Sequence, residues 1–257
     1  MDLDTIGLVV PILAVLFFLL LEKYSNRKKA IFDGRGKSII AIELIALVLS
    51  LILASVLLLP LVMSISNLQI FSMSQLQLPA YVTFALSFLL IDFINYINHR
   101  VHHKIPFLWR FHRLHHSDKK INALTTWLHH PFEVISTFVI VITLYVLFDI
   151  PVIVMIVYGV AFGAHAAFTH FNILVPESIN KYLQKIFVTP NAHMVHHALD
   201  LLDGNSNFGQ LFLFWDWIFG TYKYRSNNEL NAMEYGIDFN QSPQKNSFHQ
   251  YLINPFK

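Results

Sequence analysis

The chain has 257 residues, of which 55% are hydrophobic and 13% are charged, and its net charge is +2. A soluble domain carries about 25% charged residues, so the composition predicts an integral membrane protein, and the small net charge without a basic stripe argues against a nucleic-acid partner. The chain has no cysteine, which excludes a disulfide framework, a thiolate zinc site, a cysteine-ligated iron–sulfur cluster and covalent c-type haem.

The first apolar stretch covers residues 6–21, contains no charge, and approaches the roughly 20 residues that cross a bilayer. A cleaved signal peptide is the alternative interpretation. However, Asp2 and Asp4 stand where a signal peptide has basic residues, and no small-x-small cleavage site follows. We therefore expect an uncleaved membrane helix.

Two further apolar stretches follow, residues 38–63 and 80–98, each interrupted by one acidic residue. The segments 22–37 and 99–133 are rich in Lys and Arg, whereas 64–79 has no charged residue. By the positive-inside rule, both basic segments are expected to be cytoplasmic, and the amino terminus and the uncharged loop are expected outside.

Two shorter apolar arms, residues 134–148 and 152–168, flank an Asp-Ile-Pro turn at 149–151. Each arm is short for a full span, so the pair is expected to form either a tight transmembrane hairpin or a re-entrant one. In both cases its ends return to the cytoplasmic side. The chain is amphipathic from Asn172 and polar after Tyr224, and few strands are predicted, so we expect an all-α fold.

Histidine is the most informative residue type in the chain. Thirteen of the fourteen histidines lie between positions 99 and 197, and eight of them form three motifs: His99-x3-His103, His112-x2-His115-His116 and His193-x2-His196-His197. Positions i, i+3 and i+4 of a helix lie within an arc of about 100°, so each His-x2-His-His is expected to point three imidazoles in one direction. Eight nitrogens exceed the roughly four ligands of one structural zinc site, so two metal ions are predicted.

A single histidine in a membrane protein is more often a packed or interfacial residue than a metal ligand. His249, in the polar tail, is interpreted in that way, and His102, which lies off the line joining His99 to His103, is expected to be a bystander. The metal interpretation depends on the repeated spacing on one side of the membrane, not on any one residue.

The residue types also restrict the metal chemistry. Imidazole suits zinc, copper, iron and nickel, and the chain lacks the His-Glu-x2-His of common metalloproteases. Bridging carboxylates, which are usual in two-metal hydrolases, are scarce, because only four acidic residues lie near the motifs: Asp118, Glu133, Asp200 and Asp203. Many imidazoles beside a bilayer therefore favour iron and oxygen chemistry.

Two alternatives from other classes stay open. One is a histidine-rich membrane metal transporter, and the other is a zinc-dependent hydrolase acting on lipid head groups. A transporter places its ligands near the bilayer midplane, whereas the predicted spans here are nearly free of histidine.

The motifs and the segments around them resemble the fatty acid hydroxylase superfamily, which includes sterol desaturases, sterol methyl oxidases, alkylglycerol monooxygenases and lipid hydroxylases. The resemblance covers about residues 80–224, and the spacings agree as well as the residue types. Besides the three histidine motifs, it includes Trp109-Arg110-Phe111-His112-Arg113-Leu114-His115-His116-Ser117-Asp118, His130-Pro131-Phe132-Glu133, Thr169-His170-Phe171-Asn172, Thr189-Pro190, Asn207-Phe208-Gly209 and Trp215-Asp216-Trp217-Ile218-Phe219-Gly220-Thr221.

The resemblance implies a membrane enzyme with a non-haem di-iron centre, which uses dioxygen and two electrons to hydroxylate or desaturate a lipid C–H bond. It implies that two iron ions are held by nine histidines: His99, His103, His112, His115, His116, His170, His193, His196 and His197. His130 and His165 are left open as further ligands, and no catalytic residue beyond the ligands is expected. We expect no fused cytochrome b5-like domain, so electrons are expected from a separate donor protein, cytochrome b5-like or ferredoxin-like.

These patterns divide the chain into three parts. Residues 1–79 are expected to hold N-terminal transmembrane helices, and residues 80–224 are expected to form the hydroxylase-like catalytic domain, with membrane helices and a cytoplasmic helical cap. Residues 225–257 are expected to be a polar C-terminal tail. The predicted protein is thus a multi-pass helical bundle whose histidine site faces the cytoplasm.

Metal-bound histidines need hydrogen-bond acceptors that fix their tautomer. Nine polar residues are candidates, although each fits equally well as a cap or a surface residue: Asp92, Asn95, Asp118, Glu133, Asn172, Asp200, Asp203, Asn207 and Asp216. Three tryptophans are interpreted either as anchors at the cytoplasmic interface or as packed residues: Trp109, Trp215 and Trp217.

The residues leave the substrate open among sterol, sphingolipid, ether lipid, ornithine lipid and carotenoid. They do not distinguish hydroxylation from desaturation, because both reactions begin with abstraction of a hydrogen atom. They also leave the oligomeric state open.

Overall fold

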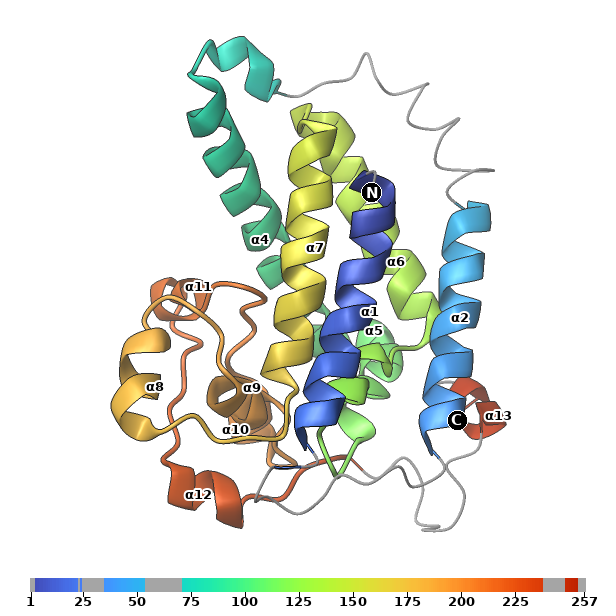
Figure 1. The fold of residues 1–257 in the computed structure, drawn as a ribbon, viewed down its shortest axis with the longest axis vertical. Coiled ribbons are helices and arrows are strands. Elements are labelled where there is room, and N and C mark those ends of the chain that lie inside the picture. The colour runs from blue at the N-terminus through green and yellow to red at the C-terminus, as the bar shows by residue number, and fades with distance from the viewer. Residues whose placement is uncertain (1–2, 23, 25–34, 54–70, 238–247, 254–257) are drawn as a thin grey trace.

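The computed structural model describes residues 3–22, 24, 35–53, 71–237 and 248–253. Within these ranges the regular elements are helices, apart from two isolated β-bridges, so the predicted all-α class is confirmed. Long helices form a bundle (Figure 1): α1 (Leu3–Glu22), α2 (Arg35–Leu53), α4 (Ala80–Lys104), α6 (Pro131–Phe148) and α7 (Val152–Thr169).

Three of these helices, α4, α6 and α7, are long and apolar enough to cross a membrane. Both α6 and α7 have 18 residues, because α6 begins at Pro131, three residues before the apolar arm expected from the sequence. Proline is tolerated in a first helical turn, and Glu133 there interacts favourably with the helix dipole. This length favours the transmembrane hairpin over the re-entrant one.

The first two predicted spans are described in part. α1 is an apolar helix that contains the predicted span 6–21 and extends it to Leu3 and Glu22, and α2 continues to Leu53. The remainder of the predicted second span, residues 54–63, lies outside the described residues.

The ends of the long helices that are nearest to the histidine motifs lie at the same end of the bundle (Figure 1). The N-terminus, the start of α4 and the α6–α7 turn lie at one end of the bundle, and the segments that follow α1, α4 and α7 leave from the other. The sequence predicts this arrangement, because it assigns the two basic segments to one side of the membrane. The identity of that side as cytoplasmic stays a prediction.

Close packing between α1 and α7 fixes part of the bundle. Val15 and Ala167 share one apolar core with Ile42 of α2. A Cβ atom added at Gly163 of α7 would lie only 2.7 Å from the ring carbons of Pro11 in α1, so the absence of a side chain permits this approach.

Short helices form a cap at the histidine end of the bundle (Figure 1). The cap helices are α5 (Pro106–His112), η4 (His115–Ser117), η5 (Ala123–Trp127), α8 (Glu177–Leu183), α9 (Pro190–His196), α10 (Leu201–Gly204), α11 (Phe214–Ile218), α12 (Asn227–Ala232) and α13 (Phe248–Ile253). One further short helix, η3 (Met73–Leu76), lies at the opposite end of the bundle. Isolated bridges join Phe187 to Phe212 and Ala198 to Tyr235.

One buried carboxylate, Asp92 in the middle of α4, attaches the cap to the bundle. Its oxygens accept hydrogen bonds from the Leu211 and Phe212 N–H groups at 3.1 and 3.3 Å and from the Trp215 indole at 2.9 Å. The Tyr158 hydroxyl of α7 donates a fourth bond at 2.9 Å. A buried carboxylate needs such partners, so the segment 211–215 is held at the level of Asp92.

Candidate metal centre

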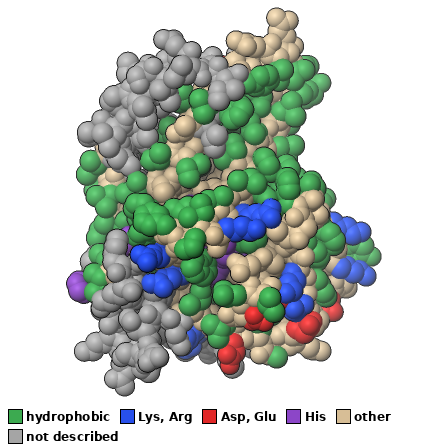
Figure 2. Space-filling model, turned by 180° about the vertical axis from the view of Figure 1, so that it is seen from behind, with side chains coloured by type: hydrophobic (Ala, Val, Ile, Leu, Met, Phe, Trp, Pro, Cys, Tyr) green, Lys and Arg blue, Asp and Glu red, His purple; other side chains and the backbone are tan. Residues whose placement is uncertain are grey.

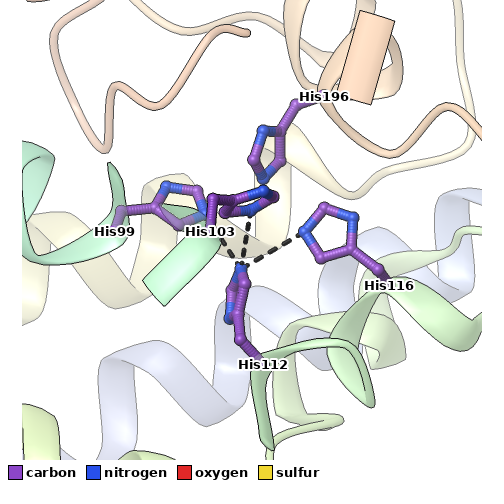
Figure 3. A group of neighbouring side chains, drawn as sticks. All are labelled: His99, His103, His112, His116 and His196. Carbon is purple, nitrogen blue, oxygen red and sulfur yellow. Dashed lines mark hydrogen bonds between the residues drawn. The ribbon is translucent and has the colours of Figure 1, made fainter. Parts of the chain in front are cut away.

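Five histidines converge from three separate elements. His99 and His103 lie one turn apart on α4, and the α5–η4 segment and α9 contribute the others (Figure 3). One ring nitrogen from each histidine of this five-histidine group lies within 4.8 Å of the corresponding nitrogens of the others, and its members are His99, His103, His112, His116 and His196.

Four further histidines form a second buried group. One of them lies in η4, one is the C-terminal cap of α7, one lies in α9 and one is the C-terminal cap of α9. The nitrogens of this four-histidine group also lie within 4.8 Å of one another, and its members are His115, His170, His193 and His197. The two groups adjoin, because the rings of His116 and His197 stack with centroids 4.4 Å apart.

The structure corrects one expectation about the two His-x2-His-His motifs. Each was expected to point three imidazoles in one direction, but each motif divides its histidines between the groups. In the first motif α5 ends at His112 and a 3₁₀ turn carries His115, so the motif does not lie on one regular helix. In the second, His193 and His197 join the four-histidine group and His196 joins the other.

Hydrogen bonds to Nδ1 fix the ring orientation of several histidines. In the five-histidine group, His99 Nδ1–H donates to the Phe208 carbonyl at 2.9 Å, and His196 Nδ1–H donates to the Ser206 carbonyl at 2.8 Å. In the four-histidine group, His170 Nδ1–H donates to the Ala166 carbonyl at 2.7 Å. Because a neutral ring carries one proton, these acceptors leave the Nε2 lone pairs free for a metal ion.

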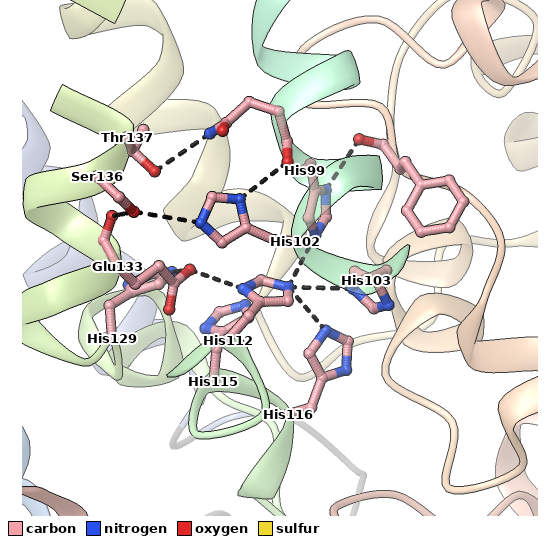
Figure 4. A network of polar contacts seen from close by, with 12 residues as sticks. His99, His102, His103, His112, His115, His116, His129, Glu133, Ser136 and Thr137 are labelled. Carbon is pink, nitrogen blue, oxygen red and sulfur yellow. Dashed lines mark hydrogen bonds and ion pairs between the residues drawn. The ribbon is translucent and has the colours of Figure 1, made fainter. Parts of the chain in front are cut away.

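Glu133 supplies a carboxylate acceptor to the five-histidine group (Figure 4). Its Oε1 accepts a hydrogen bond from His112 Nδ1 at 2.7 Å, and both side chains are buried. His112 Nε2 then faces the Nε2 atoms of His99, His103 and His116 at 3.2, 3.1 and 3.2 Å. Two ligands at right angles around an ion with bonds of ~2.1 Å are separated by about 3 Å, so the spacing fits a metal site.

Burial keeps these rings neutral. It lowers the pKa of His112, His116 and His197 well below the usual value, and nearby imidazoles add to the effect. It lowers the pKa of His170 and of His196 to about 3. Neutral rings whose Nε2 lone pairs face one another repel, and a bound cation removes that repulsion. The donor set therefore fits metal ions.

A hydrogen-bonded loop supports the five-histidine group from the cap side. Asp216 accepts bonds from the Phe208 and Gly209 N–H groups at 2.8 and 2.7 Å, and from the Thr221 hydroxyl at 2.6 Å. Burial raises the pKa of Asp216 to about 6 in spite of these bonds. Since the Phe208 carbonyl is the acceptor of His99, Asp216 positions a candidate ligand through the loop.

Two aromatic side chains pack against the five-histidine group. The Phe208 ring lies with its centroid 5.1 Å from that of His103 and 5.7 Å from that of His196. Trp109 lies against His103 on the other side, at 4.8 Å. Both residues therefore limit water around the five-histidine group, and Trp109 is a packed residue at this site.

Of the nine candidate acceptors, Glu133 accepts a hydrogen bond from a histidine of the five-histidine group, His112. Asp92 and Asp216 instead hold segments of the cap in place. The contacts of the others are as follows: Asn95 donates to Ile91 O, Asp118 accepts from Thr125, Asn172 N–H donates to Glu22, Asp200 caps α10, Asp203 pairs with Lys223 and Arg225, and Asn207 joins Ala192 to Lys223.

The two histidines left open as ligands lie outside both groups. His130 Nδ1 accepts from the Phe132 N–H at 3.1 Å, and its Nε2 lies 3.3 Å from the Leu252 carbonyl. His165 lies in α7, away from both groups. His102, interpreted as a bystander, lies outside them too, and His249 is exposed in α13.

Sequence reasoning missed several contributors to the site. The His129 ring stacks on His115, with centroids 4.4 Å apart and planes 11° apart, and its Nε2 lies 3.8 Å from Glu133. The Gln210 amide lies 2.8 Å from His99 Nδ1. The carbonyl acceptors were also missed, because any residue type can supply a carbonyl and the sequence carries no signal for them.

Comparison with known proteins identifies the family. A sequence model of the fatty acid hydroxylase family matches residues 84–221, which is more than half of the chain. The resemblance deduced from the histidine motifs is therefore confirmed, and the chain belongs to the fatty acid hydroxylase family. No solved structure shows a significant match to the chain.

The chain is similar to lipid-modifying enzymes. It is 31% identical over 147 residues to the ornithine lipid hydroxylase OlsE of Rhizobium tropici. This match covers 57% of this chain and 43% of that protein. It is 27% identical over 170 residues to alkylglycerol monooxygenase of Homo sapiens, covering 63% of this chain and 35% of that protein. The chain thus matches less than half the length of these curated relatives.

Proposed function

We propose that this member of the fatty acid hydroxylase family is a membrane-bound, non-haem di-iron enzyme that oxidises a C–H bond of a lipid with dioxygen and two electrons. One observation carries the proposal: two adjoining groups of buried histidines present neutral nitrogens at metal-ligand spacing at the end of a bundle of apolar helices. The two groups would hold one iron ion each.

The donor set fits iron, and its lack of bridging carboxylates in the described part of the chain argues against a zinc hydrolase. Nine imidazoles surround the site, and the nearby carboxylate of Glu133 is occupied by His112. A two-metal hydrolase usually needs bridging carboxylates, which these groups lack among the described residues, and imidazole suits iron. When bound, the iron pair supplies the activation of dioxygen that an unactivated C–H bond requires.

The residues of the chain would have three tasks in this reaction. The nine histidines bind through nitrogens that face one another, and in four of them, His99, His112, His170 and His196, an acceptor at Nδ1 keeps the Nε2 nitrogen free of a proton. The rings of Phe208 and Trp109 limit water beside the ligands. The apolar helices keep the lipid tail at the site.

Hydroxylation of a membrane lipid is the reaction that the relatives favour. The names of the two relatives are ornithine lipid hydroxylase and alkylglycerol monooxygenase. The balanced reaction converts a C–H bond, dioxygen, two electrons and two protons into an alcohol and one water. Desaturation would consume the same reagents, but it would remove two hydrogens from the lipid and release two waters.

We place the site on the cytoplasmic side, because the segments next to it are the basic ones. The two electrons would then come from a separate cytoplasmic redox protein, cytochrome b5-like or ferredoxin-like. Supplying such donors one at a time to the protein in proteoliposomes, with membrane lipid present, identifies the donor by product formation.

The central test measures metal and product together. Purified protein is analysed for iron and zinc, and lipids from cells with and without the protein are compared by mass spectrometry under air and without oxygen. We expect bound iron and an oxygen-dependent lipid that has gained one oxygen. The variant His196→Ala is the inactive control, and His249→Ala is the matched control outside both groups.

Other outcomes would contradict the proposal. Bound zinc with oxygen-independent loss of a lipid head group would indicate the hydrolase, and metal uptake into sealed vesicles without a lipid product would indicate the transporter. A lipid that has lost two hydrogens would keep the di-iron oxidase but replace hydroxylation by desaturation.

A further inference from the structure

An apolar surface on the cap is not accounted for by the metal centre. Many large hydrophobic side chains of the cap are exposed, and five of them lie in two short segments, 186–187 and 217–219, where Ile218 is the most exposed at 64%. We call this surface the apolar ridge, and it consists of Ile186, Phe187, Trp217, Ile218 and Phe219. Exposed apolar patches of this kind mark interaction sites with proteins or membranes.

The two segments of the ridge form one continuous surface. The Leu213 N–H donates to the Ile186 carbonyl at 2.7 Å, and the Trp217 indole donates to the Gln184 carbonyl at 3.1 Å. The rings of Phe187 and Phe212 lie 5.7 Å apart. The ridge is therefore a rigid part of the cap, because hydrogen bonds join both of its segments.

Contacts with α4 fix the depth of the ridge relative to the membrane helices. The segment 211–215 is attached to Asp92, which lies twelve residues from Ala80 and twelve from Lys104, the two ends of α4. At 1.5 Å per residue, α4 is about 37 Å long and Asp92 lies about 18 Å from either end. The hydrocarbon of a bilayer is about 30 Å thick, so the middle of α4 lies within it.

The attachment at Asp92 also places the ridge next to α4. Phe219 lies against Phe93 of α4, with ring centroids 5.6 Å apart, and Trp215 lies against the same ring at 4.9 Å. In Figure 1, α11 and α8 lie level with the lower part of α7, whereas α12 lies at the far end of the cap. The exposed side chains of the ridge are thus continuous with the lipid-facing surface of α4.

The distribution of charge agrees with this placement. On the face shown in Figure 2, the charged side chains lie in the lower half and hydrophobic side chains cover much of the upper half. Next to the ridge, the ammonium groups of Lys181 and Lys185 lie 4.9 and 5.6 Å from the centre of the Tyr182 ring. Lysine and tyrosine together are typical of the head-group region of a membrane.

We propose that the apolar ridge inserts into the acyl chains of the leaflet on the histidine side, so that the cap is partly embedded in the membrane and not only placed beneath it. The occupant of this surface is lipid, and Lys181 and Lys185 lie at the phosphates of that leaflet. The proposal depends on the depth of the cap and not on the metal ions, so it stands independently of the proposed function.

The absence of cysteine makes the test direct, because a single introduced cysteine carries the only label. A nitroxide is attached to Ile218→Cys in proteoliposomes of phosphatidylcholine and phosphatidylglycerol, and its collisions with oxygen and with a water-soluble nickel complex are measured. Val157→Cys in α7 is the lipid-exposed reference. Leu202→Cys is the matched control, because Leu202 is 78% exposed and its carbonyl accepts from the Lys223 ammonium.

We expect the label at position 218 to lose collisions with the nickel complex and gain collisions with oxygen, as at position 157, whereas position 202 shows the opposite. The variant Ile186→Cys repeats the measurement on the other segment if the first variant folds poorly. A label at 218 that behaves like the one at 202 overturns the proposal. A label shielded from both reagents also overturns it, because a second protein chain would then cover the ridge.

Discussion

The two histidine groups differ in how their rings are held. In the five-histidine group, three rings donate from Nδ1 to acceptors, and one acceptor is the carboxylate of Glu133. In the four-histidine group, only His170 has such an acceptor among the described residues. The Nδ1 atoms of His115, His193 and His197 are buried and have no hydrogen-bond partner in the described part of the chain.

The difference teaches that similar spacing in sequence does not produce equal sites. Acceptors beyond the ligands fix the rings and raise metal affinity, and their loss costs about 10- to 100-fold. A buried donor without an acceptor costs about 1–3 kcal/mol. We therefore expect the five-histidine group to bind its ion more tightly and the four-histidine group to lose its ion first.

Removing one ligand from each group is the strongest test of this comparison. His112→Ala and His197→Ala should each lose one of the two proposed ions and lower activity by more than ~100-fold, because a lost ligand should exceed the effect of a lost acceptor. Metal analysis and lipid mass spectrometry measure both effects. The ion left in His197→Ala should resist a mild chelator longer than the ion left in His112→Ala. Equal release from both variants would contradict the difference between the groups.

Both groups consist of buried, neutral histidines, and the stability of the metal-free protein at different pH values tests this shared property. Burial lowers the pKa of His170 and His196 to about 3 in the folded state, whereas a histidine in an unfolded chain titrates near ~6.5. The unfolded state therefore binds more protons below that pH, and stability falls as the pH falls, by up to about 1.4 kcal/mol per group and pH unit.

Asp216 has the opposite effect on stability. Its pKa is raised to about 6 in the folded protein, so the folded state binds one more proton there than the unfolded state and is stabilised as the pH falls through that value. The histidines outnumber it, so the net loss should persist. Thermal unfolding of the metal-free protein in detergent between pH 8 and pH 5 measures the effect. A melting temperature that does not fall in this range would show that the rings are not buried as neutral groups.

Replacing the carboxylate at Glu133 should make the two groups more alike. Glu133→Gln keeps the shape but removes the charge that His112 Nδ1–H contacts, so the ion of the five-histidine group should bind about 10- to 100-fold more weakly. Chelator competition should show two phases of release in the unaltered protein and closer phases in the variant. Glu177→Gln, which alters a carboxylate of α8 that accepts from the Asn227 N–H, is the control and should change neither phase.

The smallest expected effect is at His129, which stacks on His115 in the four-histidine group. An aromatic pair contributes about 0.5–1.5 kcal/mol, so His129→Ala should weaken that ion by about 2- to 10-fold. His129→Phe should restore most of the affinity, because it keeps the stack. If both variants lose the ion equally, His129 acts as a ligand and not as a packing partner.

Much of the fold could be predicted from the sequence. Apolar stretches located α1, α4 and the α6–α7 hairpin, because a helix in lipid needs a long uncharged run. The start of α6 was placed three residues late, since Pro131 looks like a break in sequence but serves as the first helical residue. The attachment of the cap to Asp92 involves backbone N–H groups about 120 positions away, and no local pattern encodes such a pair.

The candidate site was predictable to a different extent. The nine proposed ligands followed from spacing and resemblance, and the structure brings all nine into two groups, although their binding of iron stays a prediction. The division of the first motif between the groups was not predictable, because it depends on the end of α5 at His112 and the tight turn after it. The division of the second motif, on α9 and its C-terminal cap, depends on which tertiary neighbours surround each ring, and spacing in the sequence does not specify these. The family was confirmed by the match over residues 84–221.

The hydrogen bonds of the Asp92 carboxylate also determine when the cap can attach to α4 during synthesis of the chain. Its donors lie 66 to 123 positions later in the chain. At about 5–20 residues per second, the last of them is translated roughly 6 to 25 s after Asp92. During that interval the nascent chain carries a carboxylate without its partners, and a product truncated before residue 211 would lack three of the four donors permanently. The cap is therefore attached to α4 only after the chain that follows the last histidine motif has been translated.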